Sequence, residues 1–109
     1  MTKYEYVGMP DPFEAIAEPN RRRILDILTK GEMPAGALGA ALHLSQPGAS
    51  KHLRVLRTAG LVKVRSEGRQ RLYALRPEVL AEVDAWLAPY RRFWSARLDA
   101  LDAHLKEEN

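Results

Sequence analysis

The residues from Ser45 to Gly60 constrain the fold most, because they specify one helix together with both of its ends. Ser45 is a good N-cap, and Ala49, Leu53 and Leu56 follow at the i, i+4, i+7 spacing of a buried helical face. Gly60 supplies a stop, since glycine readily adopts the left-handed conformation that follows many helices. Such a helix buries one stripe and leaves its other side chains facing solvent or a ligand.

The hydrophobic period changes immediately after Gly60, and the new period predicts a β-hairpin. Residues 61–65 and 70–75 have the apolar and β-branched content of two short strands. The intervening Ser-Glu-Gly-Arg, residues 66–69, is typical of a hairpin turn in which Gly68 adopts a positive φ.

Three shorter helices are expected before Ser45. The first is a one- or two-turn segment over residues 12–17, which begins at Asp11. Asn20 is expected to cap the second helix, and Gly31 to end it. Pro34 is expected to open the third. The apolar faces of the second and third helices carry Ile24, Leu25, Ile27, Leu28, Leu38, Ala41 and Leu42.

A last helical region is expected from Pro77 to about Lys106, kinked or split near Ala88 because Pro89 follows. The complete order is two helices, a helix-turn-helix pair, a hairpin and a long helix, which is the winged helix-turn-helix plan. For 109 residues we expect one domain, mainly α with a small β-hairpin. Its winged-helix core spans residues 11–76, and its C-terminal dimerisation helices span residues 77–106.

Positive charge is concentrated in the middle of the chain, although the net charge is only +3. Residues 45–76 contain eight Lys or Arg and one acid, Glu67, whereas the flanking segments carry −1 and −3. A basic segment between mildly acidic flanks is typical of a nucleic-acid-binding face on a soluble scaffold. The alternative is an ordinary solvated surface, and the order of the elements favours nucleic acid.

Several functional classes lack support in the sequence. There is no cysteine, no glycine-rich phosphate loop and no credible set of catalytic residues, so we expect no enzyme. Ser50, Lys51 and His52 are neighbours on one helix and cannot converge on one substrate atom. The chain has no 18-residue apolar run, and Met1–Tyr6 contains no apolar leader-like stretch, so a cytoplasmic location is expected.

The run from Leu44 to Val62 (LSQPGASKHLRVLRTAGLV) resembles the recognition-helix signature of ArsR-type repressors. Residues 18–25 (EPNRRRIL) resemble the start of that family's second helix, and residues 67–73 (EGRQRLY) resemble its wing. The resemblance spans about residues 12–75 and implies a winged-helix transcriptional repressor that binds double-stranded DNA as a homodimer. Gly48 departs from the pattern, because the family more often has a side chain there.

The first turn of the recognition helix carries the expected DNA readers. Gln46 can form two hydrogen bonds with the edge of an adenine, and Ser50 can reach a base or a phosphate. Ser45, at the helix N-terminus, suits a phosphate. Lys51 and Arg54 point away from the buried stripe and therefore face solvent or DNA. For Gln46 and Ser50 the alternative role is helix capping.

Further expected DNA contacts lie on the same helix and on the wing. His52 is expected to contact a phosphate or base, with packing inside the protein as its alternative. Arg69 at the hairpin tip suits the minor groove, where negative potential is concentrated. Arg65 and Arg71 flank it on the strands, and for all three arginines the alternative is an exposed side chain without a partner.

The triple arginine Arg21–Arg23 opposes the dipole of the helix that it opens. We expect these side chains to pack and to pair with acids such as Glu18 or Asp26. The alternative is that one of them contacts a DNA phosphate.

Positions at which ArsR-type sensors hold metal ligands carry other residues here. Pro34 and Gly36 correspond to the cysteines on the helix before the turn, and Asp84-Ala85-Trp86 has tryptophan in place of histidine. The later ligand positions are Arg97 and Ala100, and the three histidines have no spacing that converges on one ion. We therefore expect no metal site, no cofactor and no response to metals.

The C-terminal region carries an apolar stripe that fits a dimer contact. Leu80, Leu87, Trp94 and Leu101 recur every seven residues. The family resemblance adds the first helix to this contact, so the expected interface comprises Phe13, Leu87, Tyr90, Trp94, Leu98 and Leu101. A dimer would read a palindromic operator. The alternative is that this helix packs only on its own domain.

A second functional class remains open, namely a winged-helix module that binds protein instead of DNA. Such modules usually lose the basic recognition helix and wing, and this chain keeps both. The sequence does not identify the operator, a small-molecule or protein effector, or the choice between activation and repression.

Overall fold

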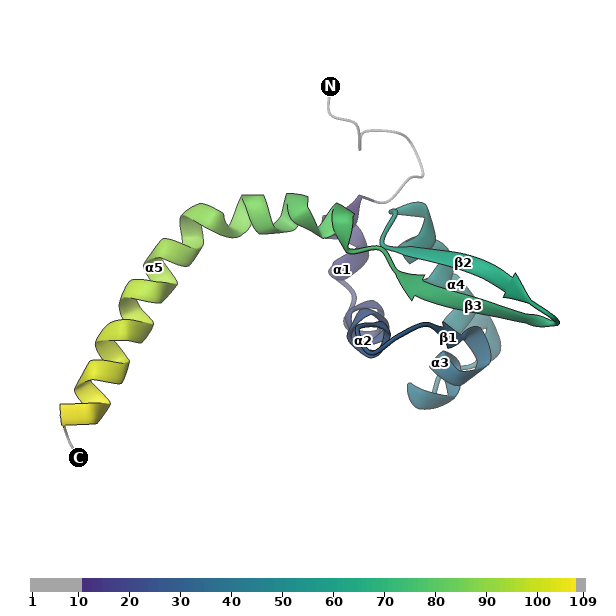
Figure 1. Cartoon of the computed structure of the whole chain (residues 1–109), viewed down its shortest axis with the longest axis horizontal. Coiled ribbons are helices and arrows are strands. Elements are labelled where there is room, and N and C mark those ends of the chain that lie inside the picture. The colour runs from purple at the N-terminus through teal and green to yellow at the C-terminus, as the bar shows by residue number, and fades with distance from the viewer. Residues whose placement is uncertain (1–10, 108–109) are drawn as a thin grey trace, which may run out of the picture.

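The computed structural model describes residues 11–107, which form a small winged-helix body with one long helix projecting from it (Figure 1). Met1–Tyr6, which were expected to contain no leader-like stretch, lie outside this range. The elements are α1 (Pro12–Ile16), α2 (Pro19–Leu28), β1 (Met33–Pro34), α3 (Ala35–Ala41), α4 (Gln46–Thr58), β2 (Val62–Glu67), β3 (Gln70–Leu75), the 3-10 turn η1 (Pro77–Val79) and α5 (Leu80–Glu107). The expected fold class is confirmed: the chain is mainly helical, with a small antiparallel sheet.

The helix starts follow from side-chain caps, with one correction. Asp11 and Ser45 cap α1 and α4, as expected. The N-cap of α2 is Glu18, not Asn20, and its carboxylate accepts a hydrogen bond from the amide of Arg21 at 3.0 Å. The cause is Pro19, which has no amide hydrogen and a fixed φ, and which therefore takes the first helical position and moves the cap two residues earlier than expected.

The sheet has the order β1-β3-β2 and includes a strand that the sequence did not indicate. The unexpected strand, β1, pairs with Leu72 and Tyr73 of β3. Residues Glu67 and Gln70 pair across the hairpin, so the turn is shorter than expected and contains only Gly68 and Arg69. Gly68 has a φ of +60°, which provides the positive dihedral angle that a two-residue hairpin turn needs.

The core forms around α4. Its expected stripe of Ala49, Leu53 and Leu56 is buried, together with Ile24 of α2 and Leu38 of α3. Gly60 ends the helix with a φ of +81°, and its amide donates to Arg57 of the last turn. The orientation of α4 is therefore fixed by α2 and α3 on its buried side.

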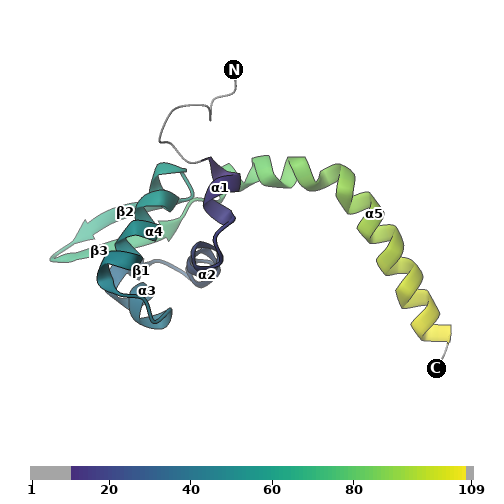
Figure 2. The same ribbon diagram turned by 180° about the vertical axis from the view of Figure 1, so that it is seen from behind.

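Helix α5 leaves the body after its first turns and extends away from it (Figures 1 and 2). Pro89 lies inside it without splitting it, and both views show a bend near the middle of the helix. Of the two expected outcomes, a kinked helix or two separate helices, the structure has the kinked helix. Proline favours a kink because it removes one backbone hydrogen bond and crowds the preceding turn. Near the body, Trp86 of α5 meets Phe13 of α1 edge to face, with ring centroids 5.7 Å apart.

We expect His43→Gly to raise the free energy of unfolding by up to about 1 kcal/mol. His43 lies between α3 and α4 with a φ of +55°, a left-handed conformation that strains residues other than glycine. Glycine relieves this strain, although part of the gain is lost to its larger freedom in the unfolded chain. Urea unfolding of His43→Gly, with His43→Val as the destabilised control, measures the effect. A glycine variant less stable than the wild type would contradict the prediction.

Candidate nucleic-acid interface

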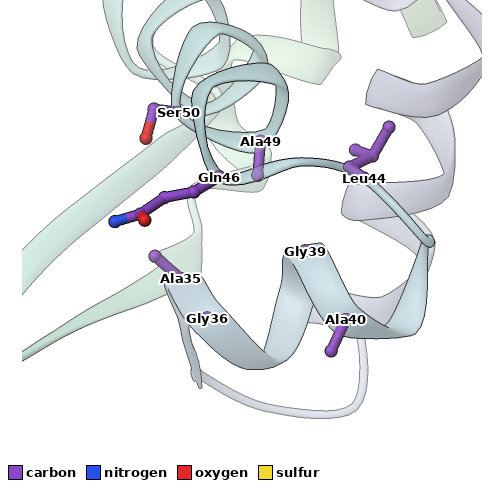
Figure 3. A pocket seen from close by; sticks show the side chains of 8 residues that line it. All are labelled: Ala35, Gly36, Gly39, Ala40, Leu44, Gln46, Ala49 and Ser50. Carbon is purple, nitrogen blue, oxygen red and sulfur yellow. The ribbon is translucent and has the colours of Figure 1, made fainter.

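The first turn of α4 presents Gln46 and Ser50 beside a groove between α3 and α4. Both side chains are exposed and point to the same side of the helix (Figure 3). The groove encloses about 520 Å³ and is lined on the α3 side by Ala35, Gly36, Gly39 and Ala40. Because these residues have almost no side chains, Gln46 and Ser50 stand clear of α3 and remain accessible.

The helix cap and the basic side chains of α4 surround these two residues. Ser45 Oγ accepts a hydrogen bond from the amide of Gly48 at 3.1 Å. Lys51 and Arg54 are exposed, as the buried stripe requires. The N-terminal half of α4 therefore offers polar, neutral and cationic groups on one accessible side.

A second groove joins α4 to the wing. It encloses about 550 Å³ and is lined by Gln46 and Ser50 of α4 and by Arg69 and Arg71 of the hairpin, along with residues that include Gln70 and Tyr73. The structure therefore brings together four residues that the sequence analysis named from two separate motifs. Gln70 and Tyr73 were missed, because their only sequence signal was membership of a strand.

Arg65, expected as a DNA contact, is held by two carboxylates. Its Nε donates to Glu32 at 3.0 Å and its Nη2 to the other oxygen of Glu32 at 2.5 Å, while Nη2 also lies 2.8 Å from Glu67. The hydrogen bond from Arg65 holds the pKa of the Glu32 carboxyl below its ordinary value, and the charges of Arg65 and Lys63 act in the same direction. The same hydrogen bond raises the pKa of Arg65. This ion cluster links β2 to the segment just before β1.

His52 points toward α2, as its alternative role of packing inside the protein requires. Its Nδ1 lies 3.3 Å from Nη1 of Arg21 and 3.8 Å from the carboxylate of Glu18, and its side chain is only 16% exposed. No local pattern indicates this partner, because Arg21 and His52 are 31 residues apart.

The triple arginine packs as expected, but the expected acidic partners are wrong. Arg21 Nε donates to the carbonyl of Ala15 at 2.7 Å, and Arg22 Nη1 donates to the carbonyls of Ile16 and Ala17 at 2.7 and 3.1 Å. These carbonyls lie at the C-terminal end of α1, where helical carbonyls have no partner within their own helix. The two guanidinium groups therefore cap α1 instead of pairing with Glu18 or Asp26 side chains.

The expected dimer residues lie mostly on an exposed apolar stripe of α5. Leu87 is half-buried, whereas Trp94 is 48% and Leu98 63% exposed. Phe13 and Tyr90 are also exposed, as are three apolar residues that the expected interface omitted: Trp86, Phe93 and Leu105. Such a continuous apolar stripe on a helix that leaves the body marks an interaction surface.

Two kinds of function find no support within residues 11–107. The described residues contain no group of three or more His, Cys, Asp or Glu side chains placed to hold a metal ion. Asp84, the residue nearest to a ligand pattern in the sequence, forms an ion pair with Arg91. No helix in the described range has the length and apolar character needed to cross a membrane.

Comparison with known proteins gives consistent matches. The family HTH_20, described as a helix-turn-helix domain, matches residues 16–65. The chain is 35% identical to the transcriptional repressor SdpR of Bacillus subtilis over 72% of this chain and 88% of that protein. The crystal structure of the ArsR family transcriptional regulator RHA00566 superposes with a TM-score of 0.66 at 31% identity, covering 76% of this chain and 86% of that one.

A further match concerns assembly. The homodimeric winged helix-turn-helix DNA-binding domain Mb0332 of Mycobacterium bovis, described as a possible ArsR-family regulator, superposes with a TM-score of 0.60. The two sequences are 31% identical, and the match covers 73% of this chain and 74% of that domain.

The ion cluster at the wing yields a titration prediction. Because the pKa of Glu32 is lowered, the stabilising effect of its pairing with Arg65 is present above the ordinary glutamate pKa and is lost as the pH falls through the lowered value. We expect Arg65→Gln to raise the Glu32 titration midpoint toward the ordinary value of about 4.3. Carboxyl ¹³C NMR measures this, and Lys63→Gln, which removes a weaker influence, should raise it less. An unchanged midpoint in Arg65→Gln would contradict the assignment.

Proposed function

Because this chain belongs to the ArsR family of winged helix-turn-helix transcriptional regulators, we propose that it acts as a homodimeric repressor that binds a palindromic operator in double-stranded DNA. The family consists of DNA-binding regulators and not of enzymes. The observation that carries the proposal is the groove shared by Gln46 and Ser50 of α4 with Arg69 and Arg71 of the wing. These four residues belong to the segment 45–76, whose eight basic residues and one acid give a net charge of +7.

In this proposal the two sides of the protein groove, α4 and the wing, contact different features of DNA. The first turn of α4 enters the major groove, where Gln46 and Ser50 contact base edges. Ser45 at the helix N-terminus and the exposed Lys51 and Arg54 contact phosphates.

The wing lies against the adjacent backbone. Arg69 at its tip reaches the minor groove, and Arg71 contacts a phosphate. The DNA backbone between the major and the minor groove then runs along the hollow that separates α4 from the hairpin. This hollow is about 550 Å³ in volume.

Two of the residues first considered as DNA contacts receive supporting roles. Arg65 already binds Glu32 and Glu67, and a DNA contact would have to break this pairing. We assign it to holding the wing at a fixed angle to the body. His52, oriented toward α2, is assigned to holding α4 in place.

Dimerisation follows from the apolar stripe on α5. One recognition helix reads only a few base pairs, too few to select one operator in a genome. Pairing through α5 and Phe13 would bury the exposed aromatics and place two recognition helices about 34–36 Å apart, which matches successive turns of DNA. The homodimeric state of the related domain Mb0332 supports this arrangement.

The proposal also states that metals do not regulate this protein. Pro34 and Gly36 stand at the ArsR cysteine positions, and Asp84 is paired with Arg91. Any effector would therefore be of another chemical kind, or a protein.

We expect the reading residues and the charge residues to behave differently on substitution. Gln46→Ala and Ser50→Ala should relax sequence preference by about 1–3 kcal/mol for each base contact. Lys51→Ala and Arg69→Ala should weaken binding to all sequences alike and reduce the salt dependence. Selection of sites from a random duplex library, followed by fluorescence anisotropy on selected and scrambled DNA, measures both effects.

The outcome of this experiment also separates the two functional classes. Failure of the wild type to select any sequence, or binding that does not weaken between 50 and 200 mM salt, would reject DNA reading and favour the protein-interaction module. For six to ten phosphate contacts, the affinity should fall about 10³–10⁵-fold over that range.

We expect the double variant Trp94→Ala with Leu101→Asp to be monomeric and to lose operator affinity far more than affinity for random DNA. The reason is that a charge and a void in the apolar stripe oppose pairing of two α5 helices. Ala96→Asp, which adds a charge to the opposite face of α5, is the matched control and should stay dimeric. Sedimentation velocity gives the oligomeric state. A wild-type monomer at micromolar concentration that still binds its operator specifically would contradict the proposal.

A further inference from the structure

Arg21 of α2 contacts two other helices at once. Its Nε donates to the carbonyl of Ala15 at the end of α1, at 2.7 Å, and Nη2 lies 3.4 Å from the carbonyl of Glu14. Its Nη1 faces Nδ1 of His52 on the recognition helix α4, at 3.3 Å. One planar guanidinium group therefore joins α1, α2 and α4.

The chemistry of this contact gives Nδ1 of His52 its role. A guanidinium group can only donate hydrogen bonds, so Nδ1 is the acceptor in the contact with Arg21. Glu18, whose carboxylate lies 3.8 Å from the same Nδ1, also accepts the amide hydrogen of Arg21. The side chain of His52 is thus oriented from α2 by groups that are themselves anchored.

On its other side, α1 contacts the helix proposed to form the dimer. Ala15 is fully buried, and Phe13, two residues earlier, packs edge to face on Trp86 of α5. Trp86 in turn lies 5.2 Å, ring to ring, from Tyr90. A continuous series of contacts therefore runs from the apolar stripe of α5, through α1 and Arg21, to the middle of the recognition helix.

We propose that Arg21 is a positioning residue that couples the orientation of the recognition helix to the dimer helix, through His52 on one side and α1 on the other. The inference rests on the proposed function, because it concerns the same reading helix and the same dimer contact. A rearrangement of α5 that moves Phe13 then changes operator affinity without any ligand touching α4.

Arg22 provides a matched control within the same helix. It caps α1 through the carbonyls of Ile16 and Ala17, as Arg21 does through Ala15, and it is exposed. If Arg21 acted only by stabilising α1, substitution of either arginine would have the same consequence. Coupling through His52 is specific to Arg21.

The first experiment is a double-mutant cycle on the selected operator DNA. Arg21→Gln and His52→Ala should each weaken operator binding about three- to tenfold, the value of one hydrogen bond, and leave affinity for scrambled DNA unchanged. The double variant should be no weaker than either single variant. His52→Asn, which keeps an acceptor near the Nδ1 position, should recover most of the loss, and Arg22→Gln should stay within twofold of the wild type.

The second experiment tests the connection to the dimer. Phe13→Ala, at concentrations where sedimentation shows a dimer, should reduce operator affinity in the wild-type background and have no further effect in Arg21→Gln. If Arg21→Gln fails to fold by circular dichroism, Arg21→Lys replaces it, since lysine keeps the charge but lacks the fork that bridges Ala15 and His52. Imidazole ¹⁵N NMR should show Nδ1 as acceptor in the wild type and a changed signal in either Arg21 variant.

The outcomes separate the two proposals. Three outcomes would overturn the coupling while operator binding by the wild type stands. They are additive losses of operator affinity in the double-mutant cycle, equal losses in Arg21→Gln and Arg22→Gln, and an undiminished effect of Phe13→Ala in the Arg21→Gln background. Equal loss on operator and scrambled DNA for His52→Ala, with no effect of Arg21→Gln, would make His52 a direct phosphate contact. Absence of any selected operator would instead reject the proposed function itself.

Discussion

The burial of one stripe on α4 is the constraint on which the rest of the structure depends. Ala49, Leu53 and Leu56 can be removed from water only if α2 and α3 close over that side of the helix. Once they do, Lys51 and Arg54 lie on the accessible side, because helical geometry separates the two faces. Gln46 lies two helical turns before Leu53, on the side of the buried stripe. It stays exposed because the neighbouring α3 residues Ala35 and Gly36 are small.

The body alone leaves α5 without a partner. After Trp86 contacts Phe13, the helix continues with large apolar side chains that are more than half exposed, such as Phe93 and Leu98. Water contact with so much apolar surface is unfavourable, so this helix is the part of the described chain whose stability depends most on assembly. Pro89 lies inside this helix, which bends near its middle and whose distal half extends clear of the body. Fold and oligomer are thus linked through one helix.

The sequence predicted those elements whose signals are local. Ser45, the α4 stripe and Gly60 each act within a few residues, and the hairpin needed only alternating strands and Gly68. The strand β1 was missed because two residues show no period, and its existence depends on β3 lying beside it about 40 positions later. Glu18 displaced Asn20 as the cap of α2, because Pro19 is well suited to the first helical position, whereas a cap at Asn20 would leave it outside the helix.

The residues of the candidate site fall into the same two groups, those predicted from local sequence and those positioned by tertiary contacts. Exposure of Ser50 and Arg69 followed from local position, but Glu32, which binds Arg65, and Arg21, which faces His52, are 33 and 31 residues away in the sequence and are brought there by tertiary packing. This matters for electrostatics, because a count of charges along the chain treats all cations alike. The charge of Arg65 is offset by its two partners, Glu32 and Glu67. In the proposed complex, the attraction of DNA therefore comes from the cations with exposed positions around the groove, Arg69 and Arg71, and from Lys51 and Arg54 on α4. The same proposal makes Arg65 a support that sets the angle of the wing, because a DNA contact would have to break its pairing with the two carboxylates.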